Sequence, residues 1–259
     1  MTTGLTKGFY LQALEDDYNP KTSEGLFVHT NQSSSDLQPG DVVCVKGKVQ
    51  ENYNLTQLKA ENNNWVKQGE QSAPVATAIE VMADDANFDQ TLERYEGMLV
   101  KTTEALDMRV TRTFGYDYAS RRNNMVVAQG RINMHPNQNF AAGSDEAKQQ
   151  STENAERRLF IESDAKAANG TVPYYPDFGR TDADQNGSTE DYIRIDDTIV
   201  GLEGVLSYSY GDYRLIATNT LTNDNFVRND PRTEGIDMEE GDLRIATFNV
   251  LNYFNSPFG

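Results

Sequence analysis

Two segments of this 259-residue chain repeat the same pattern, and this repeat constrains the fold more than any other feature. Six positions of residues 43–58 match residues 200–215 at a constant offset of 157. The matches pair Val43, Val45, Gly47, Val49, Tyr53 and Leu58 with Val200, Leu202, Gly204, Leu206, Tyr210 and Leu215. An earlier apolar run, 26–28, matches 159–161 at an offset of 133, so the second copy carries 24 extra residues between its two runs.

Both copies alternate apolar and polar residues with a period of two, which is typical of strands with one buried face. Gly47 and Gly204 interrupt the strands at equivalent places, and a glycine there commonly marks a bulge or a sharp bend. Long, bent strands with short partners favour a closed five-stranded Greek-key barrel of the OB type. Two open β-sheets are the alternative. The sequence therefore predicts a mainly-β protein with two OB-like Greek-key β-barrels in tandem.

The repeat and the local composition predict the domain boundaries. We expect a first OB-like domain over residues 1–80 and a second over 93–218, with an Asp-rich loop inserted in the second. Further strands of the second domain are expected at 97–101, 108–114 and 125–128. One helix is predicted over 144–158, because Ser144 can cap it and acidic residues follow at its N-terminus. The Asn-, Asp-, Thr- and Gly-rich stretch 219–241 indicates an exposed linker to a third segment, 242–259.

Composition narrows the functional classes. No apolar run reaches the roughly 20 residues of a membrane-spanning helix, so we expect no membrane insertion. The first residues show no signal-peptide pattern, so we expect either a cytosolic protein or one whose export signal was removed. Cys44, the only cysteine, excludes an internal disulfide, and its apolar neighbours predict a small buried side chain. The net charge of −17 disfavours nucleic-acid binding by the whole surface and leaves a local basic patch as the route to it.

The run I-A-T-F-N-V-L-N at 245–252 resembles the first strand of the endonuclease/exonuclease/phosphatase family. In that family the asparagine matched by Asn249 lies at the active site, near the divalent metal and the scissile phosphate. An amide suits this position, because its oxygen can support the metal shell while its NH₂ group donates to a phosphate oxygen. An ordinary buried strand is the alternative for these residues taken alone.

The order of motifs along nearly the whole chain resembles large secreted bacterial extracellular nucleases, in which OB-like regions precede the nuclease domain. The motifs are the runs at 8–12, 25–28, 40–43, 55–58 and 247–252. The resemblance implies an extracellular location, DNA as a partner, and Mg²⁺ or Mn²⁺ in the parent nuclease. The family needs further acidic residues and two histidines downstream of its asparagine, whereas His29 and His135 both lie upstream. We therefore expect a fragment with an incomplete catalytic centre that does not hydrolyse DNA.

Three functions remain open at this stage. The resemblance favours an accessory nucleic-acid-binding or substrate-positioning region of a secreted metal-dependent endonuclease. A structural module that packs on the nuclease domain without binding DNA is the alternative, and the strong acidity favours it. A carbohydrate- or surface-attachment module is supported only by the versatility of the fold.

A local excess of basic residues lies between residues 94 and 135, a stretch that contains seven basic and four acidic residues. Arginines for phosphates and aromatics for base stacking are what an OB surface uses on single strands. The candidate nucleic-acid-binding residues are Arg109, Arg112, Arg121, Arg122, Arg131, Tyr116 and Tyr118. Strand alternation predicts Arg109 and Arg112 on opposite faces. Solubilising charge scattered over a hairpin is the alternative.

A candidate calcium loop lies in the extra segment of the second copy. Asp182, Asp184 and Asn186 occupy positions 1, 3 and 5 of an EF-hand-like loop, and the glycine that permits its sharp turn follows at position 6. Position 12, normally a glutamate, is Ile193, so Asp191 at position 10 would have to replace it. An acidic surface loop is the alternative.

Overall fold

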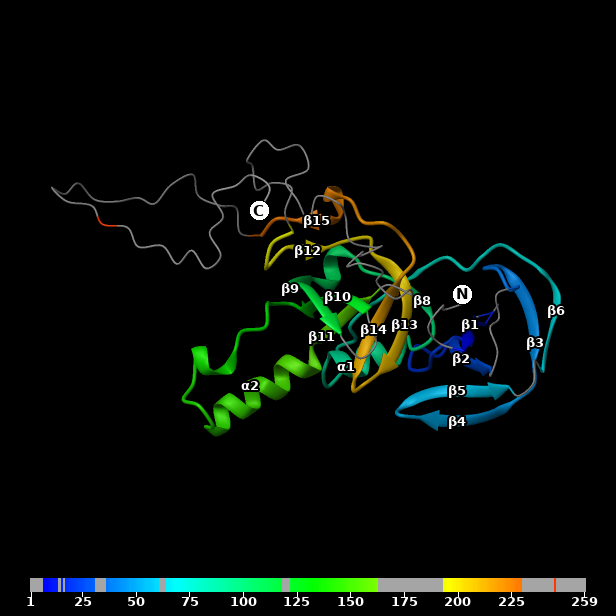
Figure 1. Cartoon of the computed structure of the whole chain (residues 1–259), viewed down its shortest axis with the longest axis horizontal. Coiled ribbons are helices and arrows are strands. Elements are labelled where there is room, and N and C mark those ends of the chain that lie inside the picture. Colours follow the sequence, from blue (N-terminus) through cyan, green and yellow to red (C-terminus); the bar gives the residue numbers. More distant parts are fainter. Residues whose placement is uncertain are drawn as a thin grey trace.

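The computed structural model describes residues 7–13, 15, 17–30, 36–60, 64–117, 122–162, 193–229 and 245 (Figure 1). The described chain is mainly β, which confirms the predicted fold class. Its strands form a four-stranded sheet, a nine-stranded sheet and a two-stranded ribbon. The described α-helices are α1, Phe88–Glu93, and α2, Asp145–Glu156, and short 3-10 helices lie at Glu104–Leu106, Pro136–Gln138 and Asn223–Asn225.

The first unit consists of the four-stranded sheet and the ribbon. The sheet has the order β1 (Gly8–Gln12), β2 (Gly25–Thr30), β5 (Leu55–Ala60), β4 (Lys48–Asn52). The ribbon pairs β3 (Asp41–Val45) with β6 (Trp65–Glu70). Phe9 and Val28 lie at the centre of a small core on one face of the sheet.

The second unit is the nine-stranded curled sheet. Its strands, in spatial order, are β15 (Phe226–Val227), β12 (Thr198–Ile199), β9 (Met108–Asp117), β10 (Arg122–Gln129), β11 (Arg158–Glu162), β14 (Asp212–Ala217), β13 (Glu203–Ser209), β8 (Leu99–Lys101) and β7 (Thr77–Ala78). The concave face encloses the main core, in which Met108, Met125, Leu159 and Leu215 are fully buried.

The strand registers confirm that the two units repeat one another. β2 and β5 run parallel with Phe27 opposite Gln57, and β11 and β14 run parallel with Phe160 opposite Arg214. These pairs are related by the offsets of 133 and 157 that the sequence predicts. The antiparallel hairpins β4–β5 and β13–β14 also have equivalent registers. Lys48 lies opposite Lys59 in the first hairpin, and their counterparts Val205 and Ile216 lie opposite each other in the second.

The two hairpin turns are equivalent as well. Tyr53 and Asn54 have φ values of 53° and 64°, and Tyr210 and Gly211 have φ values of 54° and 83°. Positive φ at both central residues is the signature of a two-residue type I′ turn, whose twist matches that of the flanking strands. Each repeat therefore ends its hairpin with an exposed tyrosine at the same point of the turn.

Five neighbouring strands of the second unit have the order β9-β10-β11-β14-β13, in which β11 and β14 are the parallel pair. A five-stranded Greek-key barrel would have closed edges, whereas these strands belong to a larger sheet that β15 and β7 extend. Closed OB-like barrels and the predicted domain boundaries thus stay predictions. The described start of the predicted linker, 219–229, is packed instead: Leu221 and Phe226 enter the main core and β15 pairs with β12.

The two units share an apolar interface. Tyr10 and Phe27 of the first unit form a buried cluster with Val205 and Ile216 of the second. The Tyr10 hydroxyl donates to Ser207 Oγ at 2.7 Å across the interface. The two units therefore pack through the sheet faces that carry Phe27 and Ile216.

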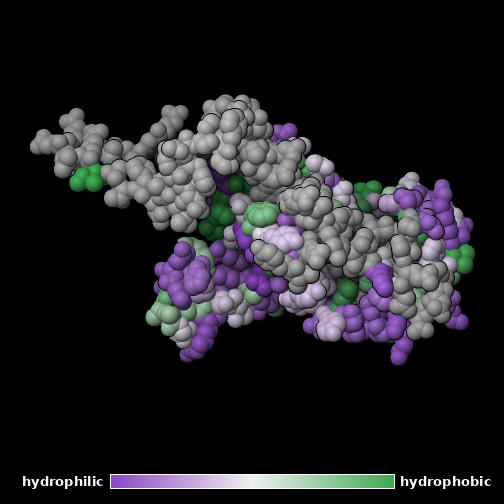
Figure 2. Space-filling view, viewed as in Figure 1, coloured by the Kyte–Doolittle hydropathy of each residue, from purple (hydrophilic) through white to green (hydrophobic). Residues whose placement is uncertain are grey.

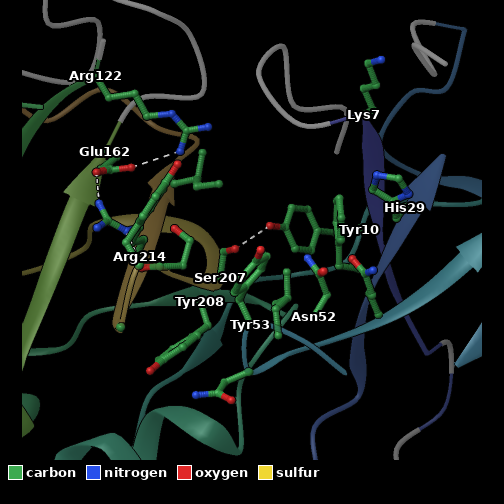
Figure 3. A pocket seen from close by; sticks show the side chains of 18 of the residues that line it. Lys7, Tyr10, His29, Asn52, Tyr53, Arg122, Glu162, Ser207, Tyr208 and Arg214 are labelled. Atoms are coloured by element: carbon green, nitrogen blue, oxygen red, sulfur yellow. Dashed lines mark hydrogen bonds and ion pairs between the residues drawn. The ribbon is translucent and has the colours of Figure 1, made fainter. Parts of the chain in front are cut away.

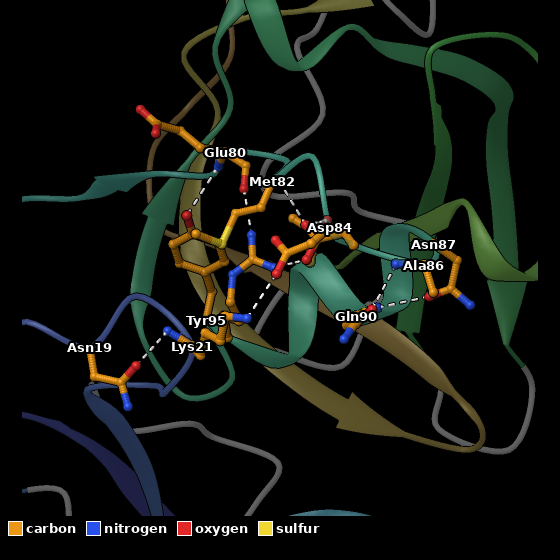
Figure 4. A network of polar contacts seen from close by, with 12 residues as sticks. Asn19, Lys21, Glu80, Met82, Asp84, Ala86, Asn87, Gln90 and Tyr95 are labelled. Carbon is orange, nitrogen blue, oxygen red and sulfur yellow. Dashed lines mark hydrogen bonds and ion pairs between the residues drawn. The ribbon is translucent and has the colours of Figure 1, made fainter.

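A polar network fixes the connection between the units (Figure 4). Asp85 accepts hydrogen bonds from Thr91 Oγ1, at 2.7 Å, and from the Met82 amide, at 2.8 Å. It also forms a buried ion pair with Arg94, whose Nη2 donates to the Glu80 carbonyl at 2.8 Å. Because these contacts satisfy both charges, the segment before and after α1 is held in one conformation.

Two further sequence expectations have an outcome. The predicted helix is confirmed as α2, with Ser144 accepting from the Ala147 amide at 3.2 Å. Cys44 is exposed rather than buried, because among the described strands β3 pairs only with β6 and the ribbon leaves one face to solvent. None of the described helices is long and apolar enough to cross a membrane. Hydrophilic side chains dominate the described surface in the view of Figure 2.

Candidate nucleic-acid interface

A cleft of about 1020 Å³ lies between the two units (Figure 3). The first unit contributes Lys7, Tyr10, Phe27, His29, Gln57 and the turn 52–55. The second contributes Asp117, Arg122, Glu162, Arg214, Ile216 and the turn 207–211. The outer faces of the two repeats thus form opposite walls, and both type I′ turns reach its edge.

A buried carboxylate links two arginines in this cleft. Glu162, 1% exposed, accepts from Arg122 Nη1 at 3.1 Å and from Arg214 Nη1. Arg214 also donates from Nε to the Ser209 carbonyl at 3.0 Å. The pairing compensates the desolvation of all three charges and fixes both guanidinium groups.

The arginines continue across the sheet around one phenyl ring. Arg112, Arg158 and Arg214 lie with their guanidinium carbons 5.5, 5.5 and 4.8 Å from the centroid of Phe160. Such distances permit cation–π attraction. Arg112 donates to Asn124 Oδ1 at 2.6 Å, and Arg158 donates to Asp212 at 2.6 Å. We call Arg112, Arg122, Arg158, Arg214 and Phe160 the arginine cluster.

Aromatic side chains flank the cluster inside the cleft. Tyr53 and Tyr210 are 89% and 78% exposed, which is unusual for such large side chains. Arg214 also lies 5.8 Å from the centroid of the Tyr210 ring. Burial, together with the charges of Lys59 and Lys7, lowers the pKa of His29, so this imidazole is neutral at pH 7 and adds no cation.

The predicted basic residues are only partly brought together. Arg112 and Arg122 belong to the arginine cluster. Arg109 is bound by Asp107 and Asp196, and Arg131 pairs with Glu153 at 3.4 Å. Arg121 and Tyr118 lie outside the described residues, and Tyr116 is half-buried opposite Asn123 on β10.

The predicted opposition of Arg109 and Arg112 is wrong. Arg112 lies opposite Val126 and Arg109 opposite Ala128, two positions that share a face of β10. The register shifts between Val126 and Val127, so Thr111 is an extra residue in β9. A β-bulge of this kind turns the following side chain to the other face. Both arginines therefore start from the outer face of the sheet.

Sequence reasoning missed Arg158, Phe160, Glu162 and Arg214. The alternation of R-L-F-I-E over β11 places its first, third and fifth residues on one face, which was the available signal. The repeat gave a second signal, for Arg214: its counterpart in the first unit, Gln57, lines the same cleft. The helix that ends just before β11 obscured the signal, since Arg158 also suits a helix C-terminus.

The predicted metal ligands Asp182, Asp184, Asn186 and Asp191, and the catalytic candidate Asn249, lie outside the described residues. Within the described ranges, no group of three or more His, Cys, Asp or Glu side chains could hold a metal ion. No protein-family model, curated protein or solved structure matches this chain.

Proposed function

We propose that this chain binds single-stranded nucleic acid along the arginine cluster and the adjoining cleft. In this proposal it is the accessory, substrate-positioning region of a secreted metal-dependent endonuclease, with DNA as the substrate. The parent nuclease would use Mg²⁺ or Mn²⁺ near Asn249, and the loop 182–191 would bind Ca²⁺. The described residues supply binding groups for this function and no reaction step.

One observation carries the proposal: four arginines from four strands converge in a chain whose net charge is −17. Glu162 is shared by Arg122 and Arg214, and Asp212 pairs with Arg158, so the four guanidinium groups of the cluster outnumber these two carboxylates. The surface therefore keeps local positive charge where the rest of the chain repels polyanions. Planar guanidinium groups match the paired oxygens of phosphate as well as those of carboxylate groups.

The shape of the site favours a single strand over a duplex. Exposed aromatic rings such as Tyr53 and Tyr210 offer stacking surfaces that unpaired bases can reach. In a duplex the bases are stacked on one another, so only the phosphates would reach the arginines. The cleft also confines its ligand between two walls, which suits a flexible strand.

A structural module that packs on a nuclease domain is the second candidate. Each arginine of the cluster already has a partner within the sheet, namely Asn124, Glu162 or Asp212. Such pairs also occur in surfaces whose charges only stabilise the fold. This candidate expects no nucleic-acid affinity at all.

Fluorescence-anisotropy titration separates the two candidates. Single-stranded and duplex oligonucleotides of about 16 nucleotides, a length that spans one OB-type site, are titrated at low and moderate salt. We expect tighter binding of the single strand and an affinity that falls with salt. The salt dependence arises because arginines that neutralise phosphates release the counterions condensed on the nucleic acid. Absence of binding at low salt would support the structural module.

Two charge reversals locate the site. Arg112→Glu places a negative charge beside Phe160, and Arg131→Glu makes the same change on an arginine that is 59% exposed and paired with Glu153. We expect Arg112→Glu to weaken binding by about tenfold or more and Arg131→Glu to have a smaller effect. Equal effects would indicate diffuse attraction and contradict the proposed site.

A further inference from the structure

Arg122 has a buried donor atom without a hydrogen-bond partner in the described part of the protein. Its Nη1 donates to Glu162, whereas its Nε is buried and has no hydrogen-bond partner. The residue is 9% exposed. An unsatisfied buried donor costs about 1–3 kcal/mol, so the fold retains this group at a measurable expense.

The geometry of the guanidinium group defines what this donor can bind. Nε and Nη2 point to the same side and form a fork that matches two oxygens of one phosphate or carboxylate. Glu162 occupies Nη1, and Nε, one of the two donors of that fork, has no hydrogen-bond partner among the described residues. Arg122 lines the cleft, so a small shift of its side chain would bring Nε to an oxyanion there and give this donor its missing partner.

Arg214 completes the arrangement on the other side of Glu162. It donates from Nη1 to the carboxylate (Figure 3) and from Nε to the Ser209 carbonyl, so two contacts fix its orientation. Glu162 therefore acts as a positioning residue that holds two guanidinium groups toward one wall of the cleft. A third cation, Lys7, lines the opposite wall.

The charge balance of the cleft favours an anion. Its lining contains three permanent cations, Lys7, Arg122 and Arg214, and two carboxylates, Asp117 and Glu162. His29 is neutral at pH 7 because its pKa is lowered. One positive charge thus remains uncompensated among the described lining residues, which an anionic ligand would neutralise.

We propose that Arg122, positioned by Glu162, forms a subsite for one phosphate group in this cleft. The inference rests on the proposed function for the source of that phosphate, a nucleic-acid backbone. It goes further in assigning a defined oxyanion position that binds phosphate by itself, which a merely cationic surface would not do.

Side-chain NMR of the arginine Nε–Hε groups tests the subsite directly. The full 259-residue chain is titrated with sodium phosphate at pH 7, with sodium chloride of the same ionic strength as the reference. The Arg122 signal is assigned by its loss in Arg122→Lys, which keeps the charge and removes the fork. We expect a saturable shift of this signal and at least a tenfold weaker phosphate affinity in Arg122→Lys.

Matched controls give each outcome a meaning. Arg131→Lys makes the same chemical change on a surface arginine and is expected to leave phosphate affinity unchanged. No saturable shift in the wild-type protein would overturn the subsite, even if oligonucleotides bind and the proposed function stands. Phosphate binding without oligonucleotide binding would support the subsite and contradict the proposed function. Acetate binding as tight as phosphate binding would overturn the assignment to phosphate.

Discussion

Gly47 and Gly204 lie close to equivalent backbone carbonyl oxygens in the two repeats. A Cβ atom on Gly47 would lie 2.5 Å from the Lys59 carbonyl oxygen, and one on Gly204 would lie 2.6 Å from the Ile216 carbonyl oxygen. Lys59 and Ile216 are themselves equivalent by the offset of 157. Gly204 lies in a continuous register, so its role is close backbone approach and the bulge suggested by the sequence is absent there.

We expect Gly204→Ala to lower the free energy of unfolding by about 1–3 kcal/mol, because the added methyl group must displace backbone of β14. The matched control is Gly69→Ala in β6, where a Cβ atom would meet nothing within 4 Å. That control should be neutral or stabilising by up to about 1 kcal/mol. Urea unfolding measures both variants, and equal stability of the two would contradict the close-approach explanation.

A buried carboxyl group at the junction of the units makes stability depend on pH. Glu96 accepts from the Thr56 amide of the first unit at 3.0 Å, and its other carboxylate oxygen is buried without a hydrogen-bond partner. Burial, opposed by the Thr56 hydrogen bond and assisted by the negative charges of Glu93 and Glu51, raises the pKa of Glu96 to about 7.

The folded protein therefore holds a proton on Glu96 that the unfolded chain releases near pH 4.5. The corresponding stability is fully present below pH 4.5 and is lost as the pH rises to about 7. The full shift corresponds to roughly 3 kcal/mol. We expect Glu96→Gln to flatten the fall of unfolding free energy with pH across this window. A wild-type and a Glu96→Gln curve of the same slope would contradict the assignment.

The single cysteine provides a test of the ribbon. Cys44 is exposed on β3, so a thiol reagent should modify it fully in the native protein, without prior unfolding. The same reaction in urea gives the rate for an unprotected thiol. A native rate lower by several orders of magnitude would indicate a buried thiol and contradict the pairing of β3 with β6 alone.

The fold was more predictable from this sequence than the candidate site, for a physical reason. Strand periodicity is local, and the matched glycines and apolar residues were enough to predict the equivalence of β4–β5 with β13–β14. Cys44 shows the limit of that reasoning. An apolar neighbourhood indicates a strand, but whether a second layer covers it depends on distant residues.

The candidate site depends on contacts that the sequence separates widely. Arg214 and Glu162 are 52 residues apart, and they meet only because β11 pairs with β14. Arg109 and Arg112 show a second difficulty, since one extra residue in β9 reverses the alternation on which their assignment depended. Charge counting found the basic segment but could not tell which cations already had acidic partners.

The last prediction concerns Glu162. Glu162→Gln keeps the shape of the side chain and removes the charge that Arg122 and Arg214 share. The positive charges of Arg122 and Arg214 would then lack their shared carboxylate at a position, residue 162, that is 1% exposed. Removing one partner of a buried ion pair costs about 3–5 kcal/mol, so we expect a loss of this size in unfolding free energy.

Glu153→Gln is the matched control, because Glu153 pairs with the exposed Arg131 at 3.4 Å. An exposed pair contributes about 1 kcal/mol or less, so this variant should unfold close to the wild type. Urea unfolding at pH 7 and at moderate salt compares the two. If Glu162→Gln loses no more than Glu153→Gln, then solvent already screens Arg122 and Arg214. In that case Glu162 does not position them, and the arginine cluster is a surface feature rather than a built site.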